Sequence, residues 1–224
     1  MSQAKQDPTA WRARAAELAD ELRAINEALA VRSFDAEDLA AATGLARQIR
    51  RRLEGPPRSR WYDGFESAAS MSAEAQAAYL DQSPIRGRLN PVAPPLVVEH
   101  AARPDGKPGI EARARLSTAY EGPPHGVHGG WVAALFDDLL GSVQGLSREP
   151  GVTATLRVHY RHVTPVDEEL RLAAWIHEDR GNRLVARATC HAGDTLTAEA
   201  EGLFVRVDVG DLQERMQQRR ARRD

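Results

Sequence analysis

Cysteine is nearly absent from this sequence, since Cys190 is the only one among 224 residues. A single thiol excludes a disulfide framework within the chain and suits a reducing compartment. The sequence also lacks a hydrophobic run long enough to span a membrane, and its N-terminus lacks the apolar run of a signal peptide. We therefore expect a cytoplasmic protein without a membrane span.

Strong charge and familiar catalytic motifs are missing as well. The net charge is −2 at pH 7, which implies no general attraction to nucleic acid. The arginine-rich C-terminal tail lacks the interleaved aromatic residues of a nucleic-acid-binding segment. Nucleophile-elbow, phosphate-loop and zincin patterns are absent. His125 and His128 could face one metal ion, but no third ligand is evident, so we expect no metal and no redox cofactor.

The first part of the chain has the spacing of helices. It predicts helices over residues 8–31 and 35–53, paired as a hairpin, and a short helix over 72–80. The apolar stripes of the two long helices consist of Trp11, Ala15, Leu18, Leu22, Ile25 and Leu29, and of Leu39, Leu45, Ile49 and Leu53. The hairpin suggests a helical extension over residues 1–82.

From Leu96 onward the pattern becomes that of strands around one long helix at 129–145. Strands are predicted over 96–101, 111–116, 152–161, 169–179, 183–192 and 195–207. Gly181 and Gly193 mark hairpin turns between the last three. A long helix on a mostly antiparallel sheet is an α+β arrangement, and we assign it to residues 83–208, followed by a basic tail at 209–224.

The start of the long helix carries the strongest chemical signal. Glycines at a helix start leave backbone N–H groups free, where the helix dipole favours negative charge, as a developing oxyanion requires. His128 and Gly129 open the helix, and Asp137 offers a general base or a nucleophile. Gly129 and Asp137 are eight residues apart, about 12 Å along a helix, too far to serve one carbonyl. Two copies across a two-fold axis could combine them.

These residues resemble a known family. His128-Gly129-Gly130 followed by Asp137, with Tyr120-Glu121-Gly122 before it and Thr153-Ala154-Thr155 after it, is similar to the PaaI-like acyl-CoA thioesterases of the hotdog superfamily. The resemblance extends over residues 83–207 and includes the final strand around Ala198-Glu199-Ala200-Glu201. It implies a hotdog fold, in which an antiparallel sheet wraps a central helix.

The resemblance also implies roles for individual residues. It makes Asp137 the catalytic acid, a choice over Asp138 that the helical pattern alone leaves open. It assigns the thioester carbonyl to the Gly129 N–H, a positioning role to His128, and the orientation of water or carboxylate to Thr153. Thr155, two residues further along the strand, is expected on the same face as Thr153.

Substrate contacts are expected around these residues. Gly130 lies beside the carbonyl site, and Trp131 and Phe136 are expected to shape the acyl pocket. Arg183 and Arg161 are candidates for the phosphates of coenzyme A, with Arg157 as a further one. Gly122 stands where some relatives have an asparagine that contacts the thioester oxygen. Its replacement is expected from Glu121 or from the loop at 124–127.

We therefore expect an acyl-CoA thioesterase, acting as a homodimer or a dimer of dimers (homotetramer), with coenzyme A entering only as part of the substrate. One alternative is a non-catalytic acyl-CoA-binding sensor, for which Asp137 would have no use. Another is a hotdog dehydratase, whose differently placed histidine is not found here. The N-terminal helices are expected either to cap the pocket or to enlarge the dimer interface.

Overall fold

The structure is a computed structural model that describes residues 8–55, 73–94, 96–147 and 151–206. The predicted tail at 209–224 lies outside these ranges. The helices are α1 (Pro8–Val31), α2 (Ala36–Arg52), α3 (Ala73–Gln82), η2 (Thr118–Tyr120), α4 (Gly129–Val143) and η3 (Gln144–Leu146). The strands are β1 (Val97–Ala102), β2 (Pro108–Arg115), β3 (Gly151–Tyr160), β4 (Glu169–Arg180), β5 (Arg183–Ala192) and β6 (Thr195–Arg206).

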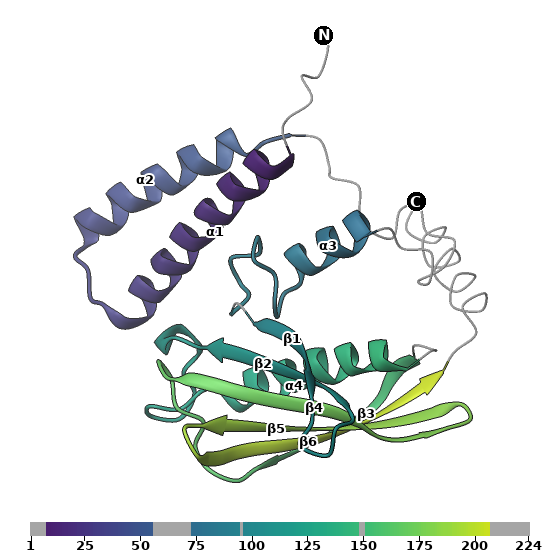
Figure 1. Cartoon of the computed structure of the whole chain (residues 1–224). Helices are drawn as coiled ribbons and strands as arrows, with labels where there is room; N and C mark the ends of the chain where they lie inside the picture. Colours follow the sequence, from purple (N-terminus) through teal and green to yellow (C-terminus); the bar gives the residue numbers. More distant parts are fainter. Residues whose placement is uncertain (1–7, 56–72, 95, 148–150, 207–224) are drawn as a thin grey trace.

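A six-stranded antiparallel sheet in the order β1-β2-β4-β5-β6-β3 forms the body of the protein. Figure 1 shows α4 lying across one face of the curved sheet. The core fills the space between them, because one face of each strand and one stripe of α4 are apolar. Its fully buried side chains include Leu135, Phe136, Leu139, Leu140 and Phe204. The α+β architecture with a long central helix and an N-terminal helical part is therefore confirmed.

The turns follow from glycine conformation. Gly181, between β4 and β5, has φ 54°, and Gly193, between β5 and β6, has φ 55°. Glycine adopts this left-handed region without the steric cost that a Cβ brings, so both predicted hairpins form. The start of β2 was predicted too late. Pro108 and Gly109 have weak strand propensity, but they pair with Ala102 and Ala101 across the tight hairpin from β1.

The apolar stripes predicted for the N-terminal helices do not form a core. Trp11, Ile25 and Leu29 of α1 are exposed, and α2 has no buried residue. Among the described residues of α1, Ala19 is the buried one. None of the described helices has the length and hydrophobicity needed to cross a membrane. The apolar stripes therefore do not attach α1 to the sheet within one chain, and its attachment has another basis.

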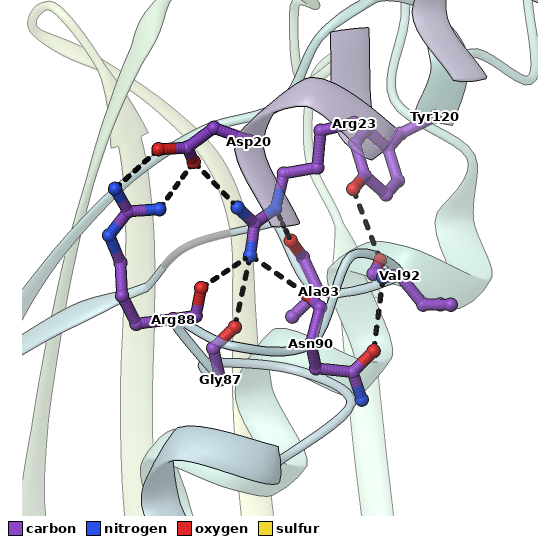
Figure 2. A network of polar contacts seen from close by, with 8 residues as sticks. All are labelled: Asp20, Arg23, Gly87, Arg88, Asn90, Val92, Ala93 and Tyr120. Atoms are coloured by element: carbon purple, nitrogen blue, oxygen red, sulfur yellow. Dashed lines mark hydrogen bonds and ion pairs between the residues drawn. The ribbon is translucent and has the colours of Figure 1, made fainter. Parts of the chain in front are cut away.

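Polar contacts attach α1 to the segment that precedes the sheet (Figure 2). The guanidinium of Arg23, with only 15% of its side chain exposed, donates to the backbone carbonyls of Gly87, Arg88, Asn90 and Ala93 at 2.8–3.1 Å. Asp20 pairs with both Arg23 and Arg88, and these cations, Arg88 above all, lower the pKa of Asp20. Arg12 forms a further pair with the mostly buried Asp81. Charge-assisted hydrogen bonds thus fix the position of α1.

Candidate active site

The first turn of α4 is organised by His128, its N-cap residue. Nδ1 of His128 accepts the N–H of Gly130 at 3.0 Å, so this ring nitrogen carries no proton. The N–H of His128 itself donates to the carbonyl of Tyr120 at 2.9 Å. His128 therefore orients the helix start and occupies the Gly130 N–H, which is then not free to bind a substrate oxygen.

The Gly129 N–H has no acceptor among the residues that the structure describes. It lies at the positive end of the α4 dipole, where a carbonyl oxygen gaining negative charge is stabilised. Tyr160, at the end of β3, donates its hydroxyl to the Gly129 carbonyl at 2.8 Å. A methyl group on Gly129 would meet the Tyr160 ring at 3.3 Å. Tyr160, which the sequence did not predict, therefore holds the Gly129–Gly130 peptide, directly after the N–H that would bind the oxyanion.

Asp137 and Thr153 come together from different elements. Thr153 Oγ1 donates to Asp137 Oδ1 at 3.2 Å, and both residues are exposed in the single chain. The contact depends on a bulge in β3, where Thr153 pairs with Phe204 and Thr155 with Leu203 of β6. Residues directly opposite each other share a face, and Phe204 is buried, so Thr153 faces α4. The bulge therefore brings the Thr153 hydroxyl within hydrogen-bond distance of the Asp137 carboxylate.

The same bulge corrects the expectation for Thr155. An uninterrupted strand would put Thr153 and Thr155 on one face, but the extra residue, Ala154, reverses the alternation between them. Thr155 pairs with Leu203, on the face opposite to that of Phe204. The prediction of a shared face is therefore wrong, and Thr155 is not brought to Asp137.

Asp138 has an environment unlike that of its neighbour Asp137. Its carboxylate accepts from Arg86 Nε at 2.6 Å, and the two side chains are 15% and 16% exposed. Arg86 also donates to the Asp138 carbonyl at 3.0 Å and contacts the Ser142 hydroxyl. Burial raises the pKa of Asp138, with Arg86 opposing the shift. This pair joins the segment before the sheet to the outer side of α4.

The structure explains why residue 122 is a glycine. A Cβ on Gly122 would lie 2.7 Å from the Cα of His128, so an asparagine cannot fit without moving the helix start. Glu121 was one expected substitute, but its Oε1 accepts the backbone N–H of His125 at 2.5 Å. His125 has φ 59°, and this contact holds the strained loop. Glu121 thus orders the loop that leads into α4.

The predicted phosphate ligands are not brought together. Arg161 pairs with Glu199, and its N–H donates to Thr197, whereas Arg183 lies opposite Val205. Thr197 and Val205 are eight residues apart on β6, roughly 26 Å at about 3.3 Å per residue. One phosphate cannot contact both arginines of a single chain. Arg157 is the third candidate, and its guanidinium lies 4.0 Å from Glu201.

The two aromatic residues expected in the acyl pocket lie in different environments. Phe136 is completely buried in the core between α4 and the sheet, so its expected place in the pocket is wrong. Trp131 is half-buried, and its ring packs edge-to-face on Tyr120 with the centroids 4.9 Å apart. It also lines a cavity of about 400 Å³.

The chain is similar in sequence to known proteins. The thioesterase superfamily model matches residues 125–199. Acyl-coenzyme A thioesterase THEM5 of Homo sapiens is 26% identical over 91 residues, 40% of this chain and 37% of the human protein. The match therefore spans little more than a third of that relative.

Solved structures extend the comparison to the fold. The thioesterase superfamily protein RHA08564 has 26% identity and a TM-score of 0.70, covering 85% of this chain and 94% of that one. Zebra fish thioesterase superfamily member 2, at 16% identity and a TM-score of 0.50, covers 62% of this chain and all of its own, and shows the fold alone. The predicted hotdog fold and the resemblance to PaaI-like thioesterases are therefore confirmed.

Proposed function

We propose that this protein hydrolyses acyl-CoA thioesters to a carboxylic acid and free coenzyme A. The contact of Thr153 with Asp137 carries the proposal. It joins a carboxylate and an orienting hydroxyl from separate elements, at a place that is exposed in the single chain. The human relative that matches residues of this domain is named as an acyl-CoA thioesterase. The substrate's phosphates would be held by arginines, and Arg157, Arg161 and Arg183 are all exposed.

In the proposed reaction, the Gly129 N–H binds the thioester carbonyl oxygen as it gains charge. Asp137 either takes a proton from water, whose oxygen attacks the carbonyl carbon, or attacks that carbon directly and forms an anhydride that water then cleaves. In both routes the C–S bond breaks, and the sulfur leaves as the thiolate of coenzyme A and is then protonated. Thr153 orients the water or the carboxylate.

Thiol release from short-chain, long-chain and aryl acyl-CoAs is the direct test. Turnover of any of these thioesters supports the proposal. Tight binding of acyl-CoA without turnover of any of them refutes it in favour of an acyl-CoA sensor.

The site is proposed to be shared between two subunits. Gly129 and Asp137 lie at the first and ninth residues of α4, too far apart to act on one carbonyl. β3 is an edge strand of ten residues, and no strand of the described chain pairs with its outer side. Long exposed edges are normally covered. Two β3 strands paired about a two-fold axis would run antiparallel, as would the α4 helices behind them, bringing Gly129 of one copy toward Asp137 of the other.

Mixing two defective subunits tests this shared site. Gly129→Pro removes the N–H at the first helical position, where proline is well tolerated, and should lower kcat about 10²-fold. Gly129→Ala is the matched control, since it keeps the N–H and adds a similar Cβ beside Tyr160. Co-refolding Gly129→Pro with Asp137→Asn should restore about a quarter of wild-type activity, because half of the dimers are mixed and each has one intact site. No recovery in verified mixed dimers would contradict a shared site.

Thr153→Val should reduce kcat about tenfold, since it removes the hydroxyl that contacts Asp137 but keeps the shape and strand preference of the side chain. Thr155→Val is the control on the opposite face and should leave thiol release nearly unchanged. Steady-state kinetics of both variants decide the matter. Equal effects of the two changes would show that the hydroxyl contact has no catalytic part.

A further inference from the structure

The cavity of about 400 Å³ lies between α1 and the start of the hotdog domain. Residues of α1, among them Arg23 and Ala30, form one wall, and the opposite wall includes Val92, Tyr120 and Trp131. Its volume falls within the range of about 300–1,000 Å³ that is typical of small-molecule pockets. The N-terminal extension thus contributes one wall of a pocket, in addition to its contacts with the segment before the sheet.

Trp131 connects this cavity to the proposed reaction site. It lies two residues after Gly129, in the first turn of α4, and its ring contacts Tyr120 edge-to-face. Tyr120 accepts the N–H of His128 through its carbonyl and donates its hydroxyl to the Val92 carbonyl at 3.1 Å. The same residues therefore form the cavity wall and hold the start of the helix.

The α1 wall is fixed in place. Figure 2 shows the Arg23 guanidinium enclosed by the carbonyls of the 87–93 segment, with Asp20 on its other side. These contacts use most of the donors of Arg23, which leaves it poorly suited to bind a phosphate in the cavity. The rest of the lining combines polar residues with a larger apolar surface, to which Ala30, Val92 and Trp131 contribute.

We infer that this cavity receives the acyl group of the thioester, and that α1 limits the size of acyl group the enzyme accepts. The inference rests on the proposed function for the identity of the ligand. The lining favours an apolar acyl group, either a medium chain or an aryl group. Acetyl, with two carbons, would leave most of the cavity unfilled.

Ala30→Trp tests the inference by filling the cavity from α1. The matched control is Ala24→Trp, on the same helix at an exposed position that does not line the cavity. We expect Ala30→Trp to lower kcat/KM about tenfold or more for octanoyl-CoA, phenylacetyl-CoA or both, with acetyl-CoA almost unaffected. The two larger substrates distinguish a chain pocket from an aryl pocket. Ala24→Trp should change none of the three.

An equal effect of Ala30→Trp on all three substrates, or no effect on any, would overturn the inference. Calorimetric binding of octanoyl-CoA, phenylacetyl-CoA and free coenzyme A separates it from the proposed function. If the wild type hydrolyses nothing but Ala30→Trp weakens the binding of either acyl-CoA and not that of coenzyme A, the cavity assignment holds and the hydrolase proposal fails. If instead the larger acyl-CoAs are hydrolysed and Ala30→Trp leaves the selectivity unchanged, the hydrolase proposal holds and the cavity assignment fails. Thermal melting establishes that both tryptophan variants are folded.

Discussion

Asp137→Asn is expected to lower kcat for acyl-CoA hydrolysis by about 10²–10⁴-fold, the usual contribution of a general base. An amide neither takes a proton from water nor forms an anhydride with the acyl group. Its oxygen can still accept the hydrogen bond from Thr153, so the local structure should be kept. Because binding is little changed, KM should stay within a few-fold. Thiol release and acyl-CoA binding, measured on the same preparation, check both statements.

Asp138→Asn is the control for this loss, since the helical pattern alone favours neither of the two acids. Asp138 faces Arg86 on the outer side of α4, and an asparagine can still accept from that guanidinium. Its thiol release, measured well below the melting temperature, should remain close to that of the wild type. If Asp138→Asn lost activity and Asp137→Asn kept it, the assignment of the catalytic acid would be wrong.

Arg86→Met should lower the free energy of unfolding at pH 7 by about 3–5 kcal/mol, the usual cost of leaving a buried charge without its partner. Asp138 is 15% exposed and Arg86 is 16% exposed, so water screens the pair poorly. Removing Arg86 also takes a donor from the Asp138 carbonyl and a contact from Ser142. Urea unfolding of the wild type and the variant measures the difference.

The pH dependence of this loss has a defined sign. Burial raises the pKa of Asp138 above the ordinary value of 3.8 even with Arg86 present, and removing the cation raises it further. Between the ordinary and the raised pKa the folded variant binds more protons than the unfolded chain, so its stability falls as the pH rises. The deficit of Arg86→Met should therefore shrink as the pH falls and Asp138 takes up a proton.

Two further variants make the Arg86 result decisive. Arg14 pairs with Glu17 on the surface of α1, where the side chains are 81% and 63% exposed, and Arg14→Met should cost less than about 0.5 kcal/mol. The double variant Arg86→Met with Asp138→Leu removes both charges and should regain most of the lost stability. If Arg86→Met were as mild as Arg14→Met, the pair would contribute little to the fold.

The elements of the hotdog domain could be predicted because each carries a local signal. Strands β4 to β6 alternate between buried residues and more accessible ones, and Gly181 and Gly193 mark the turns. The attachment of α1 could not be predicted in this way. Arg23 binds backbone carbonyls, which every residue has, so its partners leave no trace in the residue types. Arg86 and Asp138 are separated by 52 residues, beyond the reach of a local pattern.

The candidate site was predictable to a similar extent. The spacing of Gly129 and Asp137 on one helix is a local property, and Thr153 came from the family resemblance. Tyr160 was missed because its contact with Gly129 joins residues 31 positions apart, which no local pattern connects. The sequence did contain a signal for Tyr160. Leu156 and Val158 pack against the core, and Tyr160 follows at the same spacing of two residues, whereas Thr153 does not.

The bulge at Ala154 makes the length of β3 as important as its composition. Thr153 and Tyr160 are seven residues apart, a spacing that would put them on opposite faces of a regular strand, and the bulge brings both to the face of α4. Deleting Ala154 would remove the bulge and leave Thr153 opposite Phe204 and Thr155 opposite Leu203, so the hydroxyl of Thr153 would keep its face. Among relatives of this protein, a one-residue gap at the position of Ala154 would therefore accompany a regular strand with the same two side chains facing the helix, whereas chains of equal length need the bulge.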